Sequence, residues 1–202
     1  MKYLFVDSAT ATLVVAIVID DKIKYIFNDK TGKDMSSVVM PKIKEAFDTC
    51  NIGPRDIDKI FVVTGPGSFT GIRVGLTVVK VMAWTLKIPV VPISSLEVIA
   101  SGTPSDSNVA LIDARRGYVF AGEYNKRLNN TSPDRYMLLS EIKGGTFISY
   151  DDIEGAIKPN INILKVIHKH EKNKGVNPHK INPNYLKLTE AEEKLNDRRV
   201  KK

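Results

Sequence analysis

The residues best suited to chemistry lie in one glycine-rich loop. Residues 65–70 read Gly-Pro-Gly-Ser-Phe-Thr, and they follow a β-branched and aromatic run at 59–64 that predicts a buried strand. A loop of this kind between a strand and a helix can bind a dinucleotide or present Ser68 as a nucleophile. Both patterns are incomplete: Pro66 has no amide hydrogen and stands where a hydrolase elbow requires glycine, and Thr70 replaces the last glycine of a dinucleotide loop. We therefore expect a tight turn that packs the next helix against its sheet.

Metal and thiol chemistry has little support in the sequence. The chain contains three histidines and one cysteine, which are His168, His170, His179 and Cys50. His168 and His170 are two residues apart, a spacing that shares one face only on a strand. A zinc site needs roughly three or four ligands, and no carboxylate or thiol cluster completes this set. We interpret the histidines as surface residues and Cys50 as a small hydrophobic residue.

Two predicted helices must position the glycine-rich loop. The first spans 35–50 with Asp34 as its cap, and the second spans 71–86 with Thr70 as its cap. Apolar residues of the first helix sweep an arc of roughly 200°, about twice the width that one core requires. The second helix is apolar almost all round, and its polar residues are Arg73, Thr77, Lys80 and Thr85. A helix with so little polar surface is normally buried on more than one side.

We therefore predict that both helices contribute to a protein interface. Gly71 and Gly75 lie one turn apart and would let another backbone come close. The predicted interface comprises Met35, Val38, Val39, Ile43, Phe47, Gly71, Gly75, Val79 and Met82. Periodicity does not decide which of these residues face outward, because both helices are apolar beyond one face.

The rest of the chain predicts an α/β protein with a mixed sheet. A polar, breaker-rich linker at 102–107 separates two halves, so we expect an N-terminal lobe of residues 1–103 and a smaller C-terminal lobe of residues 104–202. The predicted strands lie at 2–6, 13–19, 23–27, 59–64, 90–93, 109–112, 118–124, 136–139 and 147–149. Two further helical segments are predicted at 165–174 and 189–195.

Composition indicates a cytoplasmic protein. The single cysteine excludes an internal disulfide, which suits a reducing compartment. Asp7 interrupts the N-terminal apolar run too early for a signal-peptide core, and no apolar run approaches a membrane span. We expect no association with a membrane.

Several stretches of the chain carry a family resemblance. The most specific is a loop motif comprising Gly65, Pro66, Gly67, Ser68, Thr70, Gly71 and Arg73. The others lie at 6–8, 15–17, 88–96, 113–117 and 183–186. Together they resemble the bacterial TsaB (YeaZ) family of tRNA threonylcarbamoyladenosine biosynthesis proteins. The segment from 125 to 182 adds no detailed match.

This resemblance implies an actin-like (ASKHA, ribonuclease H-like) fold of two lobes with mixed sheets. It also implies a non-catalytic subunit of the complex that forms N6-threonylcarbamoyladenosine in tRNAs reading codons that begin with A. Such a subunit pairs with a TsaD-like catalytic subunit through its first two helices, and a TsaE-like ATPase joins the pair. ATP and metal are then expected on the partner subunits, with no cofactor on this chain. Alone, the chain is expected to form a homodimer.

The charge distribution suggests where tRNA could touch such a subunit. The net charge is +7, and residues 158–202 hold 12 Lys or Arg against 5 Asp or Glu, whereas the rest holds 18 of each. A basic segment attracts phosphate backbones, although a solvated tail is the simpler interpretation. The candidate tRNA contacts are Arg198, Arg199, Lys201 and Lys202.

Two other functions stay open at the level of sequence. A small actin-like ATP-binding kinase would direct Asp7 toward phosphate or metal, yet no glycine-rich phosphate hairpin follows it. A metallopeptidase-like hydrolase would need a metal, and the related catalytic family carries paired histidines on its first helix, where residues 35–50 hold none. Titration with ATP and magnesium separates the kinase from a partner subunit.

We predict that the purified chain retains no stoichiometric zinc or iron after dialysis, because its histidines are scattered and residues 35–50 contain none. Elemental analysis measures this directly. One equivalent of metal per chain would contradict the prediction and favour the hydrolase.

Overall fold

The computed structural model describes residues 1–31 and 34–187, and its first layer is a five-stranded mixed sheet. The strand order is β3-β2-β1-β4-β5. β1 pairs antiparallel with β2, and β2 with β3, whereas β1–β4 and β4–β5 are parallel. The strands are β1 Lys2–Asp7, β2 Thr12–Ile19, β3 Lys22–Lys30, β4 Lys59–Gly65 and β5 Val90–Ser94. β1, β2 and β4 are buried almost throughout, which explains their runs of Val, Ile and Phe.

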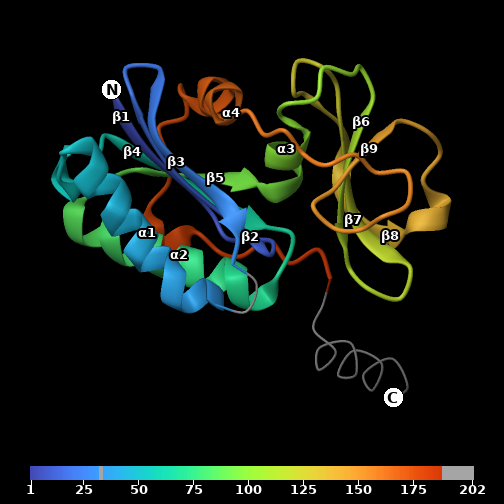
Figure 1. The fold of residues 1–202 in the computed structure, drawn as a ribbon, viewed down its shortest axis with the longest axis horizontal. Helices are drawn as coiled ribbons and strands as arrows, with labels where there is room; N and C mark the ends of the chain where they lie inside the picture. Colours follow the sequence, from blue (N-terminus) through green and yellow to red (C-terminus); the bar gives the residue numbers. More distant parts are fainter. Residues whose placement is uncertain (32–33, 188–202) are drawn as a thin grey trace.

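Two long helices lie side by side over one face of this sheet (Figure 1). α1 spans Met35–Cys50 and α2 spans Phe69–Leu86. α1 packs on β2 and β3, and α2 packs on β4 and β1, while the two helices also contact each other. The wide apolar arcs of the sequence are therefore used on two sides, by the sheet and by the neighbouring helix.

The start of α2 differs from the sequence prediction. Its N-cap is Ser68, whose hydroxyl oxygen accepts a hydrogen bond from Gly71 N at 3.2 Å. The prediction of Thr70 as the cap was wrong, because Ser68 N is already fixed by donating to the carbonyl oxygen of Ala9. Thr70 instead lies in the first turn of the helix. At the first helix Asp34 does occupy the N-cap position, but its side chain makes no capping hydrogen bond.

Among the described residues, α2 is the one helix whose length and composition would suffice to cross a bilayer. It carries buried residues along its length, from Gly71 to Ala83, and it packs on β4. α2 is thus a core helix of this fold.

A second, four-stranded sheet has the order β8-β7-β6-β9, with β6–β9 parallel and the other pairs antiparallel. Its strands are β6 Asn108–Asp113, β7 Tyr118–Tyr124, β8 Asn130–Leu138 and β9 Thr146–Ile148. The short helix α3, Ser95–Ala100, is buried and contacts strands of both sheets (Figure 1). Two mixed sheets with helices between and around them confirm the predicted α/β class.

After the second sheet the chain returns to the first lobe. Helix α4, Ile163–His170, places Val166 and Ile167 in the main core. Residues 175–187, here called the C-terminal strap, then run along the first lobe, where Asn184 N donates to Thr64 O at 2.7 Å. Three short 3₁₀ turns complete the described chain, namely η2 Pro54–Asp56, η3 Leu139–Glu141 and η4 Pro178–Lys180. The division at residue 103 separates the two sheets, and as a domain boundary it stays a prediction.

The largest boundary differences lie in the second half. β8 begins at Asn130, whereas the sequence predicted a strand only from 136, because the early residues of β8 are mostly polar. α4 begins at Ile163, earlier than the predicted 165–174, since the Asn162 side chain caps it by accepting from Lys165 N at 3.0 Å. The predicted helix at 189–195 lies outside the described residues.

We predict that Gly71→Ala lowers the free energy of unfolding by about 1–3 kcal/mol, as overpacking does in a tight core. A Cβ at Gly71 would overlap the backbone carbonyl oxygen of Ser8, which cannot rotate away. Urea unfolding measures the change. Gly53→Ala is the control, because its Cβ would lie 3.6 Å from Asp56 Oδ2, an ordinary contact. Equal stability of Gly71→Ala and the unchanged chain would refute this account.

Candidate functional site

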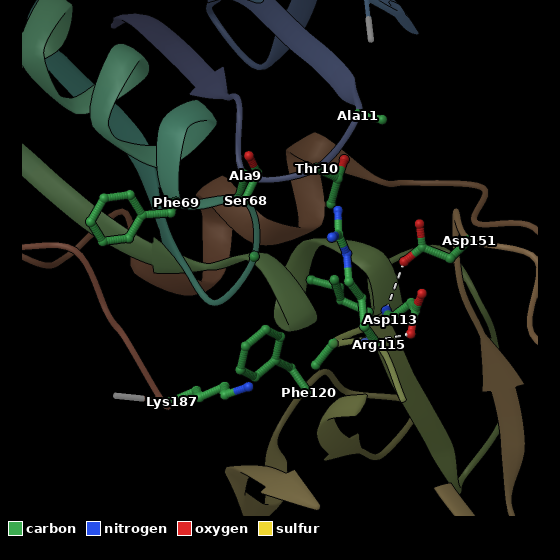
Figure 2. A pocket seen from close by; sticks show the side chains of 13 residues that line it. Ala9, Thr10, Ala11, Ser68, Phe69, Asp113, Arg115, Phe120, Asp151 and Lys187 are labelled. Carbon is green, nitrogen blue, oxygen red and sulfur yellow. Dashed lines mark hydrogen bonds between the residues drawn. The ribbon is translucent and has the colours of Figure 1, made fainter. Parts of the chain in front are cut away.

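The two lobes border a cleft of about 490 Å³ (Figure 2). Backbone turns form most of its wall: the β1–β2 turn at 9–11, the glycine-rich loop at 67–69, and the β6–β7 turn at 112–115. Phe120, Asp151 and Lys187 complete the lining. The volume lies within the range of about 300–1,000 Å³ typical of ligand pockets.

The loop motif packs the β1–β2 turn against α2. A Cβ at Gly67 would overlap the carbonyl oxygen of Ala9, and a Cβ at Gly75 would overlap the hydroxyl of Ser8. Ser8 Oγ donates to Gly71 O at 2.8 Å. The expected tight turn is confirmed, and the atoms that approach these glycines belong to the chain's own β1–β2 turn.

Asp7 is held inside this packed turn. It is 2% exposed, and its Oδ1 accepts a hydrogen bond from Ala9 N at 2.8 Å. Burial raises the pKa of the Asp7 carboxyl to about 7, against a smaller lowering by the Ala9 amide. Burial raises the pKa of the Tyr150 hydroxyl, and the Asp7 charge adds to this rise. Within residues 1–31 and 34–187, no group of three or more His, Cys, Asp or Glu side chains could hold a metal ion.

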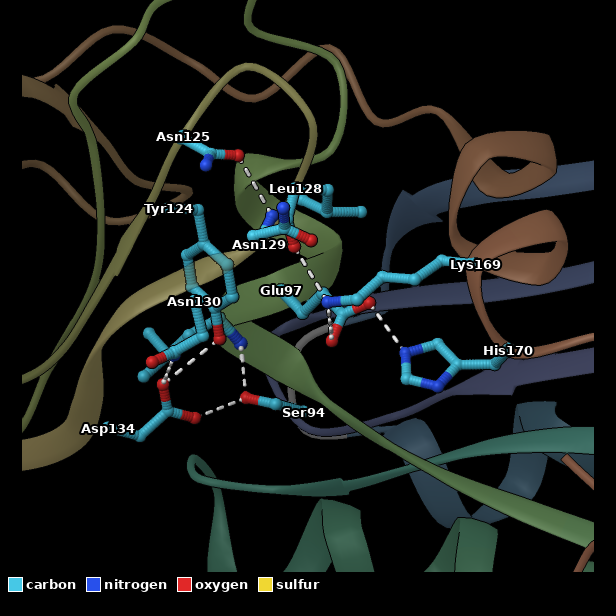
Figure 3. Close-up of polar contacts among 11 residues, drawn as sticks. Ser94, Glu97, Tyr124, Asn125, Leu128, Asn129, Asn130, Asp134, Lys169 and His170 are labelled. Carbon is cyan, nitrogen blue, oxygen red and sulfur yellow. Dashed lines mark hydrogen bonds and ion pairs between the residues drawn. The ribbon is translucent and has the colours of Figure 1, made fainter.

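The three histidines serve three separate contacts. His168 Nε2 lies 3.1 Å from Asp21 Oδ1, and the His179 ring meets Trp84 edge-on at 5.6 Å. His170 Nε2 lies 2.7 Å from Oε1 of Glu97, whose other oxygen is 3.2 Å from Lys169 Nζ (Figure 3). His168 and His179 are exposed, as the sequence predicted, whereas His170 is partly buried beside Glu97.

The predicted interface residues are mostly buried within the chain itself. Buried residues are Met35, Val39, Ile43, Phe47, Gly71, Gly75 and Val79. Val38 and Met82 remain partly exposed. The interface itself stays a prediction, and these two are the members of the predicted set that a partner could reach without rearrangement.

The sequence analysis missed the apolar side chains that do face outward. Val81 is 61% exposed and Trp84 is 63% exposed, both on α2, and Met40 on α1 is 53% exposed. Helical spacing places Val81 and Trp84 in line with the polar residues already recognised. We call this row the α2 stripe, and it comprises Arg73, Thr77, Lys80, Val81 and Trp84. Continuing the polar row by one more turn would have found it.

A groove of about 300 Å³ runs between the α2 stripe and the C-terminal strap. Its lining is Thr77, Lys80, Val81, Trp84, Pro178 and His179. Lys80 Nζ donates to the Ile181 carbonyl oxygen at 2.8 Å and so fixes the strap beside the helix. The groove is mostly apolar, so it suits a hydrophobic side chain from another chain.

The strap also joins two stretches that carry the family resemblance. Arg73 Nε donates to the Tyr185 hydroxyl at 2.7 Å, and the Phe69 and Tyr185 rings stack 5.0 Å apart. The Arg73 guanidinium lies 3.7 Å from the Phe69 ring centroid. The motif at 65–73 and the motif at 183–186 therefore form one surface at the N-terminal end of α2.

Comparison with known proteins gives consistent matches. Residues 26–177 match the family model "TsaD: tRNA N6-adenosine threonylcarbamoyltransferase". A TsaB protein from Bacillus subtilis is 36% identical over 146 residues, which cover 70% of this chain and 64% of that protein. One from Escherichia coli is 29% identical over 133 residues, covering 64% and 57%. The matched region thus spans less than two thirds of these relatives.

A solved structure supports the fold. YeaZ from Pseudomonas aeruginosa superposes with a TM-score of 0.79 at 19% identity, covering 92% of this chain and 99% of that one. At this identity the match establishes the architecture. It confirms the α/β architecture of two mixed sheets that the resemblance implied.

We predict that Asp7→Asn becomes progressively more stable than the unchanged chain as pH rises from about 4 to 7. The folded-state pKa of about 7 exceeds the ordinary value of 3.8, so the folded chain retains a proton that the unfolded chain loses. The stabilising effect of that proton is complete below pH 4 and lost as pH rises through 7. The difference should reach at most about 4 kcal/mol.

Denaturant unfolding across this pH range tests the prediction. Asp20→Asn is the control, because the pKa of the Asp20 carboxyl is lowered by its bond to the N-terminal amine. That control should show no gain with rising pH. A constant offset between Asp7→Asn and the unchanged chain at every pH would count against the buried carboxyl.

Proposed function

Because the chain belongs to the TsaB family, we propose that it is a non-catalytic subunit in the formation of N6-threonylcarbamoyladenosine in tRNA, binding a TsaD-like catalytic chain. The observation that carries this proposal is the α2 stripe. Val81 and Trp84 are more than half exposed on a helix whose other side is core. Exposed tryptophan beside aliphatic surface is characteristic of the anchoring residues of protein interfaces.

The shape of this region supports a helical partner. The groove between the α2 stripe and the strap has Trp84 on one wall and His179 on the other. Met40 adds an exposed apolar side chain on the adjacent α1. A helix laid along this pair would cover apolar area that water now contacts, and each buried Å² would contribute about 25 cal/mol before the costs of association.

Two observations support the proposal that ATP and metal bind to partner subunits. The glycine-rich loop that could cradle phosphate is filled by the carbonyl oxygens of Ser8 and Ala9. Asp7 is enclosed and bonded to a backbone amide instead of facing the cleft as a free carboxylate. We therefore assign ATP and metal to the TsaD-like subunit and a TsaE-like ATPase, and scaffolding to this chain.

The same stripe explains the expected homodimer. Its exposed Val81 and Trp84 form an apolar patch, and two copies can share such a patch about a two-fold axis when the partner is absent. A tRNA contact through Arg198, Arg199, Lys201 and Lys202 also remains a proposal. Those four residues lie outside the described residues.

We predict that Val81→Glu and Met82→Glu give folded proteins whose affinity for the TsaD-like chain falls by at least tenfold. A carboxylate buried without a partner at an interface costs about 2 kcal/mol or more. Isothermal titration with the purified catalytic chain measures affinity, and thermal melting reports on the fold.

Two matched variants complete this test. Val79→Glu faces inward at 0% exposure and should lower the melting temperature sharply, as should Val39→Glu on α1. Ile26→Glu on β3, which is 47% exposed, should leave both fold and binding unchanged. If folded Val81→Glu and Met82→Glu bind as tightly as the unchanged chain, this interface is excluded.

A further inference from the structure

The second sheet carries a row of three partly exposed aromatic rings, of which Phe120 lines the cleft. Tyr118 and Phe120 are two residues apart on β7 and so lie on the same face of the sheet. Tyr136 of β8 lies opposite Phe120. The Tyr118 and Tyr136 rings stack with centroids 4.8 Å apart, and Phe120 lies tilted 5.7 Å from Tyr136. Tyr124, farther along the same face, is buried in the main core beside α3. The open end of the face is therefore aromatic and reachable from solvent.

One cation lies over these rings, and a second lines the cleft together with Phe120. Lys187 Nζ lies 5.2 Å from the centroid of Tyr136, and the Arg115 side chain extends across the cleft toward Thr10 (Figure 2). The nearby carboxylates already bind backbone amides. Asp113 Oδ1 accepts from Arg115 N at 2.8 Å, and Asp151 Oδ2 accepts from Asp113 N at 2.8 Å. We call Tyr118, Phe120, Tyr136, Arg115 and Lys187 the aromatic–basic strip.

The turn that carries Arg115 is conformationally costly. Arg115, Arg116 and Gly117 have φ values of 69°, 57° and 78°, all in the left-handed region. Glycine accepts this region freely, whereas a residue with a long side chain does so only against a steric penalty. The β2–β3 turn has the same pair of positive φ values at Asp20 and Asp21, because a tight hairpin turn requires them.

We propose that the aromatic–basic strip binds unpaired nucleotides of RNA. Bases stack on exposed aromatic rings while phosphates pair with Arg and Lys, and this combination is the usual basis of single-strand recognition. An acidic protein segment would engage the cations but leave the rings unused. A duplex keeps its bases stacked internally, so it would also leave them unused.

The choice of RNA as the ligand rests on the proposed function, since the matched relatives are named for tRNA modification. The inference deepens that function by locating an RNA contact on the second lobe, among described residues and apart from the basic tail. It does not involve the α2 stripe.

Fluorescence anisotropy with the full chain tests the proposal, using a labelled single-stranded oligoribonucleotide, its duplex and AMP as probes. The single strand should bind more tightly than the duplex or AMP. With two phosphate contacts, log K should fall against log salt with a slope of about −1.4, and Arg115→Ala should reduce that slope by about 0.7. Tyr136→Ala should weaken binding about tenfold, and Tyr136→Phe should restore it.

Matched variants distinguish binding at this strip from non-specific attraction of RNA to a positively charged protein. Arg116→Ala removes the neighbouring cation of the same turn, which does not line the cleft, and should have a smaller effect than Arg115→Ala. Tyr25→Ala and Lys44→Ala remove an aromatic ring on β3 and an exposed cation on α1, and should change nothing. Melting temperatures confirm that each variant is folded.

The proposal is overturned if no probe binds, if AMP binds as tightly as the single strand, or if Tyr25→Ala weakens binding as much as Tyr136→Ala. No partner subunit takes part in these measurements. Failure here would therefore leave the proposed protein interface unaffected, and loss of that interface would leave this test unaffected.

Discussion

The contact on which the rest of the structure depends is the β1–β2 turn seated against the N-terminal end of α2. Ser8 Oγ donates to Gly71 O, and Ser68 N donates to Ala9 O, so the turn lies directly against the loop and the helix. The arrangement is possible because Gly67, Gly71 and Gly75 have no Cβ. It fixes α2 against the sheet, forms one wall of the cleft and encloses Asp7. The glycine-rich loop resembles a ligand-binding loop in sequence, but in the structure it packs α2 against the β1–β2 turn.

A second set of contacts joins the lobes away from the cleft. Glu97 of α3 is 6% exposed and is paired with both Lys169 and His170 of α4, while Lys169 Nζ also donates to Leu128 O at 2.6 Å (Figure 3). The buried Glu97 carboxylate is therefore paired with the Lys169 ammonium, since an unpaired ion there would be strongly destabilising. Because α4 follows the second sheet in the chain, these pairs hold the returning segment and the strap in place. The strap itself is held beside α2 by Lys80 and Arg73.

Local sequence patterns predicted most of the first lobe because its signals are short-range. The bounds of α1 follow from an unbroken helical period, and β1, β2 and β4 from continuous apolar runs. The interface residues were less predictable. The apolar face of each helix is wide enough for both a core and a partner, and the sequence does not say which residues serve which. Val39 and Val79 proved to be core, whereas exposed Trp84 follows a polar row that looked solvated. The aromatic–basic strip could not be predicted from the sequence. Tyr118 and Tyr136 come together only through strand pairing, and Lys187 is distant from both along the chain.

The strap gives the two proposed surfaces a physical connection. Tyr185 bonds to Arg73 at the start of the α2 stripe, and two residues later Lys187 lies over Tyr136 in the aromatic–basic strip. A partner that presses on the groove at His179 contacts the same short segment that positions Lys187. If partner binding stabilises the strap, RNA binding gains by the same free energy, because coupling between two binding sites is reciprocal. On both proposals, the strap is the segment through which partner binding and RNA binding would favour each other.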